Sequence, residues 1–160
     1  MIRKGVRLAI DWGKARVGVA SCDRDCLLCY PVETVPNSAK DPEPALRRID
    51  ELVSEYDPFE LILGWPIDLR GKNGLAVQHM TKVAAMLSQR LSIPIRVVDE
   101  RLSTATVAKQ FEEIGRNTKK RRAVIDQAAA VSILEQALEK ERQTGLPAGK
   151  LFRIDDPDGS

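Results

Sequence analysis

The hydrophobic pattern of this chain changes its period near residue 40. Before that point, three segments read as strands separated by turn residues, and residues 6–11 alternate between the two faces of a strand. After it, helical spacing alternates with short continuous apolar runs, which are typical of buried parallel strands. A meander of antiparallel strands followed by strand–helix crossovers restricts the chain to a mixed sheet that carries helices.

The predicted elements follow the order strand, strand, strand, helix, strand, helix, strand, helix, helix. Pro31 predicts an edge position for the third strand. Asp41 is expected to cap the first helix, with Pro42 as its first residue. Strands are expected at residues 6–11, 16–22, 26–35, 61–64 and 93–98, and helices at 41–56, 75–91, 104–114 and 123–142.

This order predicts one α/β domain over residues 1–143. Its five-stranded mixed sheet would hold three antiparallel strands and then two parallel strands, with helices on both faces, which is the element order of the ribonuclease-H-like fold. Residues 144–160 are rich in Gly, Pro and Asp and are expected to form a flexible tail.

Local charge says more about partners than composition does. The formal net charge of +2 neither requires nor excludes a nucleic-acid partner. Between Ile114 and Ile125, however, all the charged residues are basic: Arg116, Lys119, Lys120, Arg121 and Arg122. No secretory signal or membrane-spanning run is visible, so we expect a cytoplasmic location and no membrane partner.

Three cysteines, Cys22, Cys26 and Cys29, follow one another with the spacing C-x3-C-x2-C. Their odd number argues against a closed disulfide framework. A metal site would need a fourth ligand, and the single histidine, His79, is distant in the sequence. Reduced thiols on a hairpin are the favoured interpretation. The alternative is that one exposed thiol bridges two subunits.

Three acidic residues lie where such a sheet places its ligands. Asp11 ends the first strand and Glu100 follows the fifth, and ligands bind outside the carboxyl ends of the strands in open sheets. Asp126 shares a helix face with small apolar residues and needs a positive partner if it is buried. Mg²⁺, or Mn²⁺, would satisfy three converging carboxylates. Two such cations can activate a water and stabilise the leaving oxygen in phosphodiester hydrolysis.

Each acid also has a purely structural interpretation. Asp11 could form an Asx turn before Gly13, Asp126 could interact with a helix N-terminus, and Glu100 could pair with a surface base such as Arg101. The hydrolytic interpretation depends on the three carboxylates meeting at one edge of the sheet.

Glycines and basic residues near these acids are candidates for phosphate binding. They would lie in three segments: the turn after the first strand, the glycine-rich segment 64–74 and a basic loop at 116–122. The alternative interpretation is that these basic residues are only solvated surface charge. Trp65 is expected to pack against the sheet rather than stack on a base. The candidates are Gly13, Lys14, Arg16, Arg70, Lys72, Arg101, Lys119, Lys120, Arg121 and Arg122.

Four motifs in this order, DWGKARVGVA, GWPIDLRGKNG, VDERLST and VIDQAAA, resemble those of the YqgF/RuvX family. The resemblance spans residues 7–138 and implies a ribonuclease-H-like, magnesium-dependent nuclease with Asp11, Glu100 and Asp126 as its metal-binding acids. It also implies roles for Gly13, Arg16 and Gly18. The family is linked to two substrates, the Holliday junction of DNA and the 5′ end of precursor 16S ribosomal RNA (pre-16S rRNA).

Two other functions compete with the nuclease. An actin-like ATPase begins with a similar D-x-G hairpin but needs two such lobes, and this chain supplies one. A non-catalytic nucleic-acid-binding protein would not need all three acids. Symmetric cleavage of a junction would require a homodimer, which Cys22, Cys26 or Cys29 could link.

Overall fold

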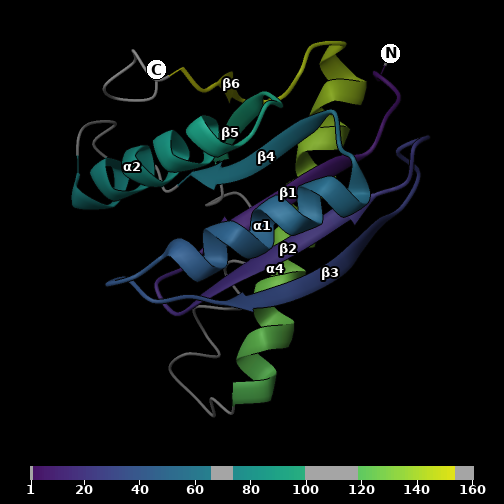
Figure 1. The fold of residues 1–160 in the computed structure, drawn as a ribbon. Coiled ribbons are helices and arrows are strands. Elements are labelled where there is room, and N and C mark those ends of the chain that lie inside the picture. The colour runs from purple at the N-terminus through teal and green to yellow at the C-terminus, as the bar shows by residue number, and fades with distance from the viewer. Residues whose placement is uncertain (1, 66–73, 100–118, 154–160) are drawn as a thin grey trace.

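Six strands form one mixed sheet in the computed structural model, which describes residues 2–65, 74–99 and 119–153, excepting the side chains of residues 119–124 (Figure 1). In chain order the strands are β1 (Arg7–Trp12), β2 (Arg16–Cys22), β3 (Cys29–Pro36), β4 (Glu60–Trp65), β5 (Ile95–Asp99) and β6 (Lys150–Leu151). Across the sheet the order is β3-β2-β1-β4-β5-β6. β1, β4 and β5 run parallel, and the remaining neighbours pair antiparallel.

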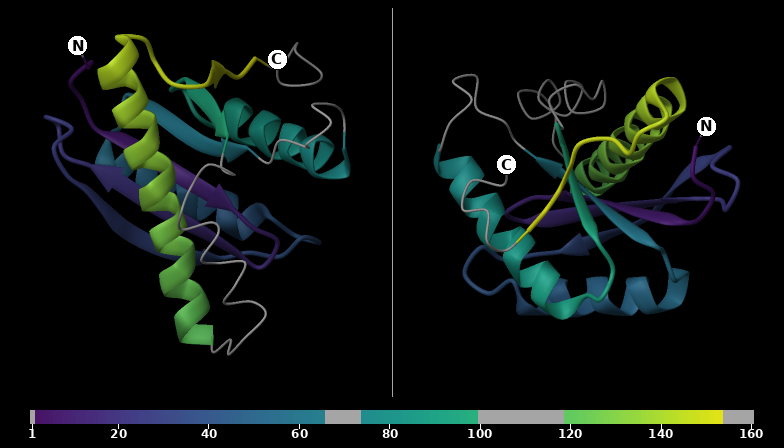
Figure 2. Two further views of the ribbon diagram at one scale, coloured as in Figure 1. Left: turned by 180° about the vertical axis from the view of Figure 1, so that it is seen from behind. Right: turned by 90° about the horizontal axis from the view of Figure 1, so that it is seen from above.

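Helices cover both faces of this sheet. α1 (Glu43–Tyr56) and α2 (Leu75–Arg90) lie on one face, and α4 (Lys119–Thr144) crosses the other (Figure 2). The alternation along β1 explains the division, because Leu8 and Ile10 join the core under α1 and α2, whereas Ala9 joins the core under α4. The predicted helices on both faces are confirmed.

The central strand β4 is apolar from Leu61 to Trp65 because both of its faces are covered. Leu61 and Leu63 pack on the side of α1 and α2, and Ile62 packs on the side of α4. β3 forms an edge of the sheet, as Pro31 predicts. Trp65 ends β4 with 5% exposure, so the expectation that it packs rather than stacks on a base agrees with the structure.

The short strand β6 corrects the predicted strand number from five to six. Lys150–Leu151 pairs with β5, and Phe152 is buried with its ring centroid 6.5 Å from that of Trp65. Arg96 holds the preceding chain by donating Nε–H to the carbonyl oxygen of Ala148 at 2.8 Å. Backbone pairing and one aromatic ring therefore fix residues 150–152 against β5 and Trp65.

Two helix boundaries also differ from prediction. α4 begins at Lys119, so residues 119–122 belong to a helix rather than to a basic loop, in keeping with the good helix propensity of Lys and Arg. Asp126 consequently lies about two turns inside α4 and not in its first turn. At α1, Pro42 occupies the N-cap position predicted for Asp41, and Asp41 Oδ1 accepts a long hydrogen bond of 3.4 Å from the backbone N–H of Glu43.

The third strand begins later than predicted, at Cys29 instead of residue 26. Asp23 Oδ1 accepts hydrogen bonds from the backbone N–H groups of Leu27 and Leu28, and Cys26 has a left-handed φ of 61°, so these residues form a turn. The helix predicted at 104–114 lies outside the described residues. No helix in the described part is long and apolar enough to cross a membrane.

Candidate functional site

Asp11 and Asp126 are buried at neighbouring positions between the sheet and α4. Asp11 pairs with Gly18 in the β1–β2 ladder, and a Cβ placed on Gly18 would lie 2.1 Å from the carbonyl oxygen of Asp126. The backbone of α4 therefore rests directly on β2, beside Asp11. The two acids are only 7% and 2% exposed, respectively. The two acids are 115 residues apart in the sequence, and the packing of α4 on the sheet places them side by side.

Small side chains allow this close approach of helix and sheet. On α4, Ala129 and Ala130 are fully buried, one turn after Asp126. On the sheet, Ala9 and Ala20 face the helix. The small apolar face predicted around Asp126 is present, and it puts a carboxylate in a region where an ionised group needs a positive partner.

Arg16 supplies a positive partner to Asp126. Its Nε lies 2.6 Å from Asp126 Oδ2, and the two side chains are 22% and 2% exposed. Arg16 lies two residues before Gly18 on β2, so the alternation of the strand directs both residues towards α4. The sequence placed Arg16 among the phosphate-binding candidates, whereas the structure places it against one of the predicted acids.

The turn between β1 and β2 presents the other nearby candidates. Gly13 donates its backbone N–H to the carbonyl oxygen of Arg16 at 2.9 Å, and a Cβ on Gly13 would lie only 2.6 Å from that oxygen. The turn is therefore too tight for a larger residue at this position. Lys14 is exposed at the tip of this turn.

The parallel strands end at the same edge of the sheet as this turn. Ile10, Leu63 and Val97 lie level across β1, β4 and β5, which end at Trp12, Trp65 and Asp99. Glu100 is the next residue in the sequence but lies outside the described residues, as do Arg70, Lys72 and Arg101. The backbone of Lys119, Lys120, Arg121 and Arg122 forms the start of α4.

Two of the three predicted metal-binding acids are therefore placed. No group of three His, Cys, Asp or Glu side chains that could hold a metal ion occurs within residues 2–65, 74–99 and 125–153. A third carboxylate for this site would have to come from another part of the chain, and Glu100 is the predicted one.

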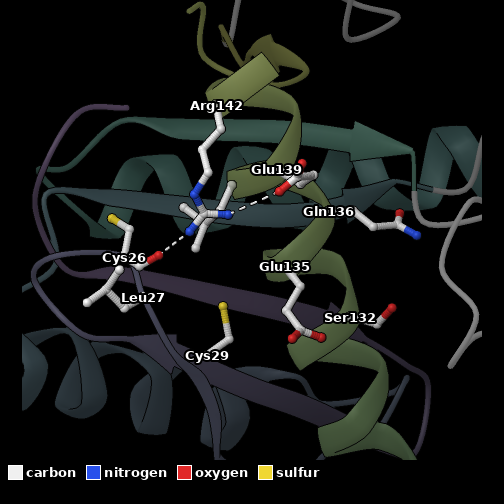
Figure 3. Close-up of a pocket in the computed structure, with 9 residues that line it drawn as sticks. Cys26, Leu27, Cys29, Ser132, Glu135, Gln136, Glu139 and Arg142 are labelled. Atoms are coloured by element: carbon white, nitrogen blue, oxygen red, sulfur yellow. Dashed lines mark hydrogen bonds and ion pairs between the residues drawn. The ribbon is translucent and has the colours of Figure 1, made fainter. Parts of the chain in front are cut away.

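A separate hollow of about 370 Å³ lies beside the C-terminal half of α4 (Figure 3). It is lined by the turn between β2 and β3 and by α4 residues between Ser132 and Arg142. Arg142 donates hydrogen bonds to the carbonyl oxygen of Cys26 and to Glu139. Glu135 and Glu139 would repel a phosphate backbone, so this hollow is a poor nucleic-acid site.

The three cysteines are free thiols, and Cys26 and Cys29 line this hollow. Cys22 and Cys26 are fully buried, and burial raises the pKa of the Cys29 thiol to about 12. Burial also raises the pKa of Cys22. The Cys22 and Cys29 thiols therefore stay protonated at neutral pH. Of the three, only Cys29 is partly exposed.

A sequence profile of the RuvX family, described as Holliday junction resolvase, matches residues 5–140. The chain belongs to the RuvX family. A relative from Cutibacterium acnes, named "Putative pre-16S rRNA nuclease", is 52% identical over 139 residues, which cover 86% of this chain and 84% of that protein. A relative of the same name from Streptomyces coelicolor is 47% identical over 150 residues, covering 93% and 89%.

Among solved structures, this RuvX family member is similar to "T. thermophilus RuvC in complex with Holliday junction substrate". The TM-score is 0.60 at 14% sequence identity, and the match covers 92% of this chain and 99% of that chain. A second structure, "Thermus thermophilus RuvC structure", matches with a TM-score of 0.57. These matches confirm the predicted ribonuclease-H-like fold, and the family confirms the predicted nuclease class.

Proposed function

We propose that this RuvX family member is a magnesium-dependent endonuclease that processes precursor 16S rRNA, with Asp11, Asp126 and Glu100 as its metal-binding carboxylates. The observation that carries the proposal is the burial of Asp11, on the sheet, and Asp126, on α4, at adjacent positions where the helix packs on the sheet. Two neighbouring buried carboxylates repel each other, and positive charge at the same point offsets that cost.

The residues present suit a hard divalent cation. Carboxylate oxygens are the ligands that Mg²⁺ prefers, and Mn²⁺ accepts the same set. When bound, the metal would supply an activated water and stabilise the charge on the leaving oxygen. Asp11 would hold it from the sheet and Asp126 from the helix, and Glu100 would complete the set from the end of β5.

The basic residues around the acids have complementary tasks. Arg16 orients the Asp126 carboxylate through the 2.6 Å contact and neutralises part of its charge. Lys14, exposed on the adjoining turn, would bind a phosphate of the substrate backbone. Arg70, Lys72, Arg101 and the four basic residues at 119–122 would extend this interaction, which would weaken as salt concentration rises.

The relatives favour RNA as the substrate. The proteins that are 52% and 47% identical to this chain are named for pre-16S rRNA, whereas the junction-bound RuvC is 14% identical. Processing of ribosomal RNA would place the enzyme in the cytoplasm. Holliday junction DNA is the second candidate, because the RuvX family profile that matches this chain is described as Holliday junction resolvase. Symmetric cleavage of a junction would require a homodimer.

One experiment tests both the chemistry and the substrate. An end-labelled RNA that carries the 5′ end of precursor 16S rRNA and a labelled four-way DNA junction are each incubated with the protein in Mg²⁺ or in EDTA. We expect the wild type to cleave the RNA only in the presence of Mg²⁺. The cleavage rate should fall by at least about 10³-fold in Asp11→Asn, and the circular dichroism spectrum of this variant should show an intact fold. Equal cleavage by Asp11→Asn and the wild type would refute the metal assignment, and cleavage of the junction alone would refute the RNA assignment.

A further inference from the structure

Asn37, just after β3, contacts the turn that carries the basic residues of the site. Arg16 pairs with Pro36 at the end of the β2–β3 ladder, where proline offers no backbone N–H. Asn37 is the first residue beyond it that can donate, and its N–H bonds to the carbonyl oxygen of Ala15 at 2.9 Å. The ladder is thereby extended by one residue, onto the turn between β1 and β2.

The side chain of Asn37 adds a second bond to the same turn. Its Nδ2 donates to the carbonyl oxygen of Gly13 at 2.7 Å. Asn37 therefore holds the turn at two carbonyls, on either side of Lys14. Because Gly13 itself donates to Arg16 within the turn, the positions of Gly13, Ala15 and Arg16 are coupled.

The Asn37 amide is not arranged for maximal stability. Its Oδ1 is buried and has no hydrogen-bond partner in the described part of the chain. A buried acceptor without a donor costs free energy, which offsets the gain from the Gly13 bond. The side chain therefore contributes little net stability while it fixes the geometry of the turn.

The geometry of the turn sets the position of Arg16. Arg16 must bring its Nε within 2.6 Å of a carboxylate that is 2% exposed, and Gly18 must stay against the backbone of α4. A displacement of about 1 Å in such a site can reduce the rate by about 10²-fold. A residue that fixes the turn therefore influences the reaction without touching the substrate.

We propose that Asn37 is a positioning residue, which clamps the β1–β2 turn and thereby keeps Arg16 on Asp126. The inference rests on the proposed nuclease function for its kinetic consequence, but the Arg16–Asp126 contact itself can be measured without any substrate.

The test compares Asn37→Asp with the wild type and with Ser38→Ala, a control at the exposed neighbouring residue. Asn37→Asp has nearly the same shape but replaces the Nδ2 donor by an oxygen that repels the Gly13 carbonyl. We expect kcat to fall 10- to 100-fold with KM changed by less than threefold. In NMR spectra without substrate, the Arg16 Nε–H signal should exchange with water at least tenfold faster than in the wild type.

Asn37→Ala provides a second variant in case the carboxylate of Asn37→Asp prevents folding. We expect its Arg16 Nε–H to exchange with water faster than in the wild type, and its urea denaturation midpoint to stay close to that of the wild type. Unchanged Arg16 Nε–H exchange in the folded variants would overturn the proposal, as would an equal effect of Ser38→Ala. If the wild type cleaved neither nucleic acid, the proposed function would fail, while the NMR measurement would still decide the role of Asn37.

Discussion

Gly18→Ala should separate the two buried acids, and its effect follows from the contact between β2 and α4. The added Cβ would lie 2.1 Å from the carbonyl oxygen of Asp126, whereas ordinary contacts begin at 3.4 Å, so α4 or β2 must move by about 1.3 Å. A shift of this size in a reacting site lowers the rate by about 10²-fold, or about 2.7 kcal/mol in activation free energy. The same overpacking should reduce the free energy of unfolding by about 1–3 kcal/mol.

Two measurements separate the catalytic effect of Gly18→Ala from its effect on stability. The cleavage rate is measured at saturating substrate and Mg²⁺, and the free energy of unfolding is measured by urea denaturation. Val19→Ala is the matched control, because Val19 is the next residue of β2 but packs on the opposite face of the sheet. It should destabilise the protein by about 1–3 kcal/mol and leave kcat within about threefold of the wild type. A Gly18→Ala enzyme with wild-type kcat would refute the argument that this backbone contact sets the positions of the acids.

Three further substitutions test other parts of the structure. Arg16→Gln should lower the free energy of unfolding by about 2 kcal/mol in urea denaturation, because it leaves the Asp126 carboxylate buried without its guanidinium; an unchanged urea midpoint would contradict this. The hydrogen bond from Arg48 holds the pKa of Glu33 below its usual value of 4.5. The ionised Glu33 carboxylate therefore stabilises the protein above pH 4.5, and this contribution is lost as the pH falls through the lower pKa of the folded state. Glu33→Gln should therefore flatten the decline of the melting temperature below pH 4.5, and a decline as steep as in the wild type would count against the pair. Phe152→Ala should cost about 2–4 kcal/mol by removing a buried ring, and a loss under 0.5 kcal/mol would show that β6 contributes little to the core.

The elements with a clear hydrophobic period were predictable from the sequence. β1 and β4 have patterns that follow directly from which of their faces are covered, and Pro31 identifies the edge strand. β6 has no such pattern, because it is two exposed residues long and is fixed by backbone pairing and by Phe152. The start of α4 was missed because a run of basic residues is compatible with either a loop or a helix.

The acids of the site were predictable as candidates, but their contacts were not. The placement of Asp11 at a strand end and of Asp126 on a small apolar helix face could be inferred from local patterns. The ion pair between Arg16 and Asp126 joins residues 110 positions apart, and no local pattern reports it. Asn37 was not singled out either, since an asparagine after a strand ordinarily indicates only a turn.

Because Asp11 is part of the central sheet and Asp126 belongs to the helix packed on it, these two proposed metal-binding carboxylates are tied to the hydrophobic interior. A mutation that shifts either acid is penalised in folding as well as in activity. Exposed residues away from these two acids are under no such double constraint and can diverge among descendants. Evolution can thus redirect this scaffold from one nucleic acid to another by rebuilding its periphery while the hydrolytic chemistry is inherited intact.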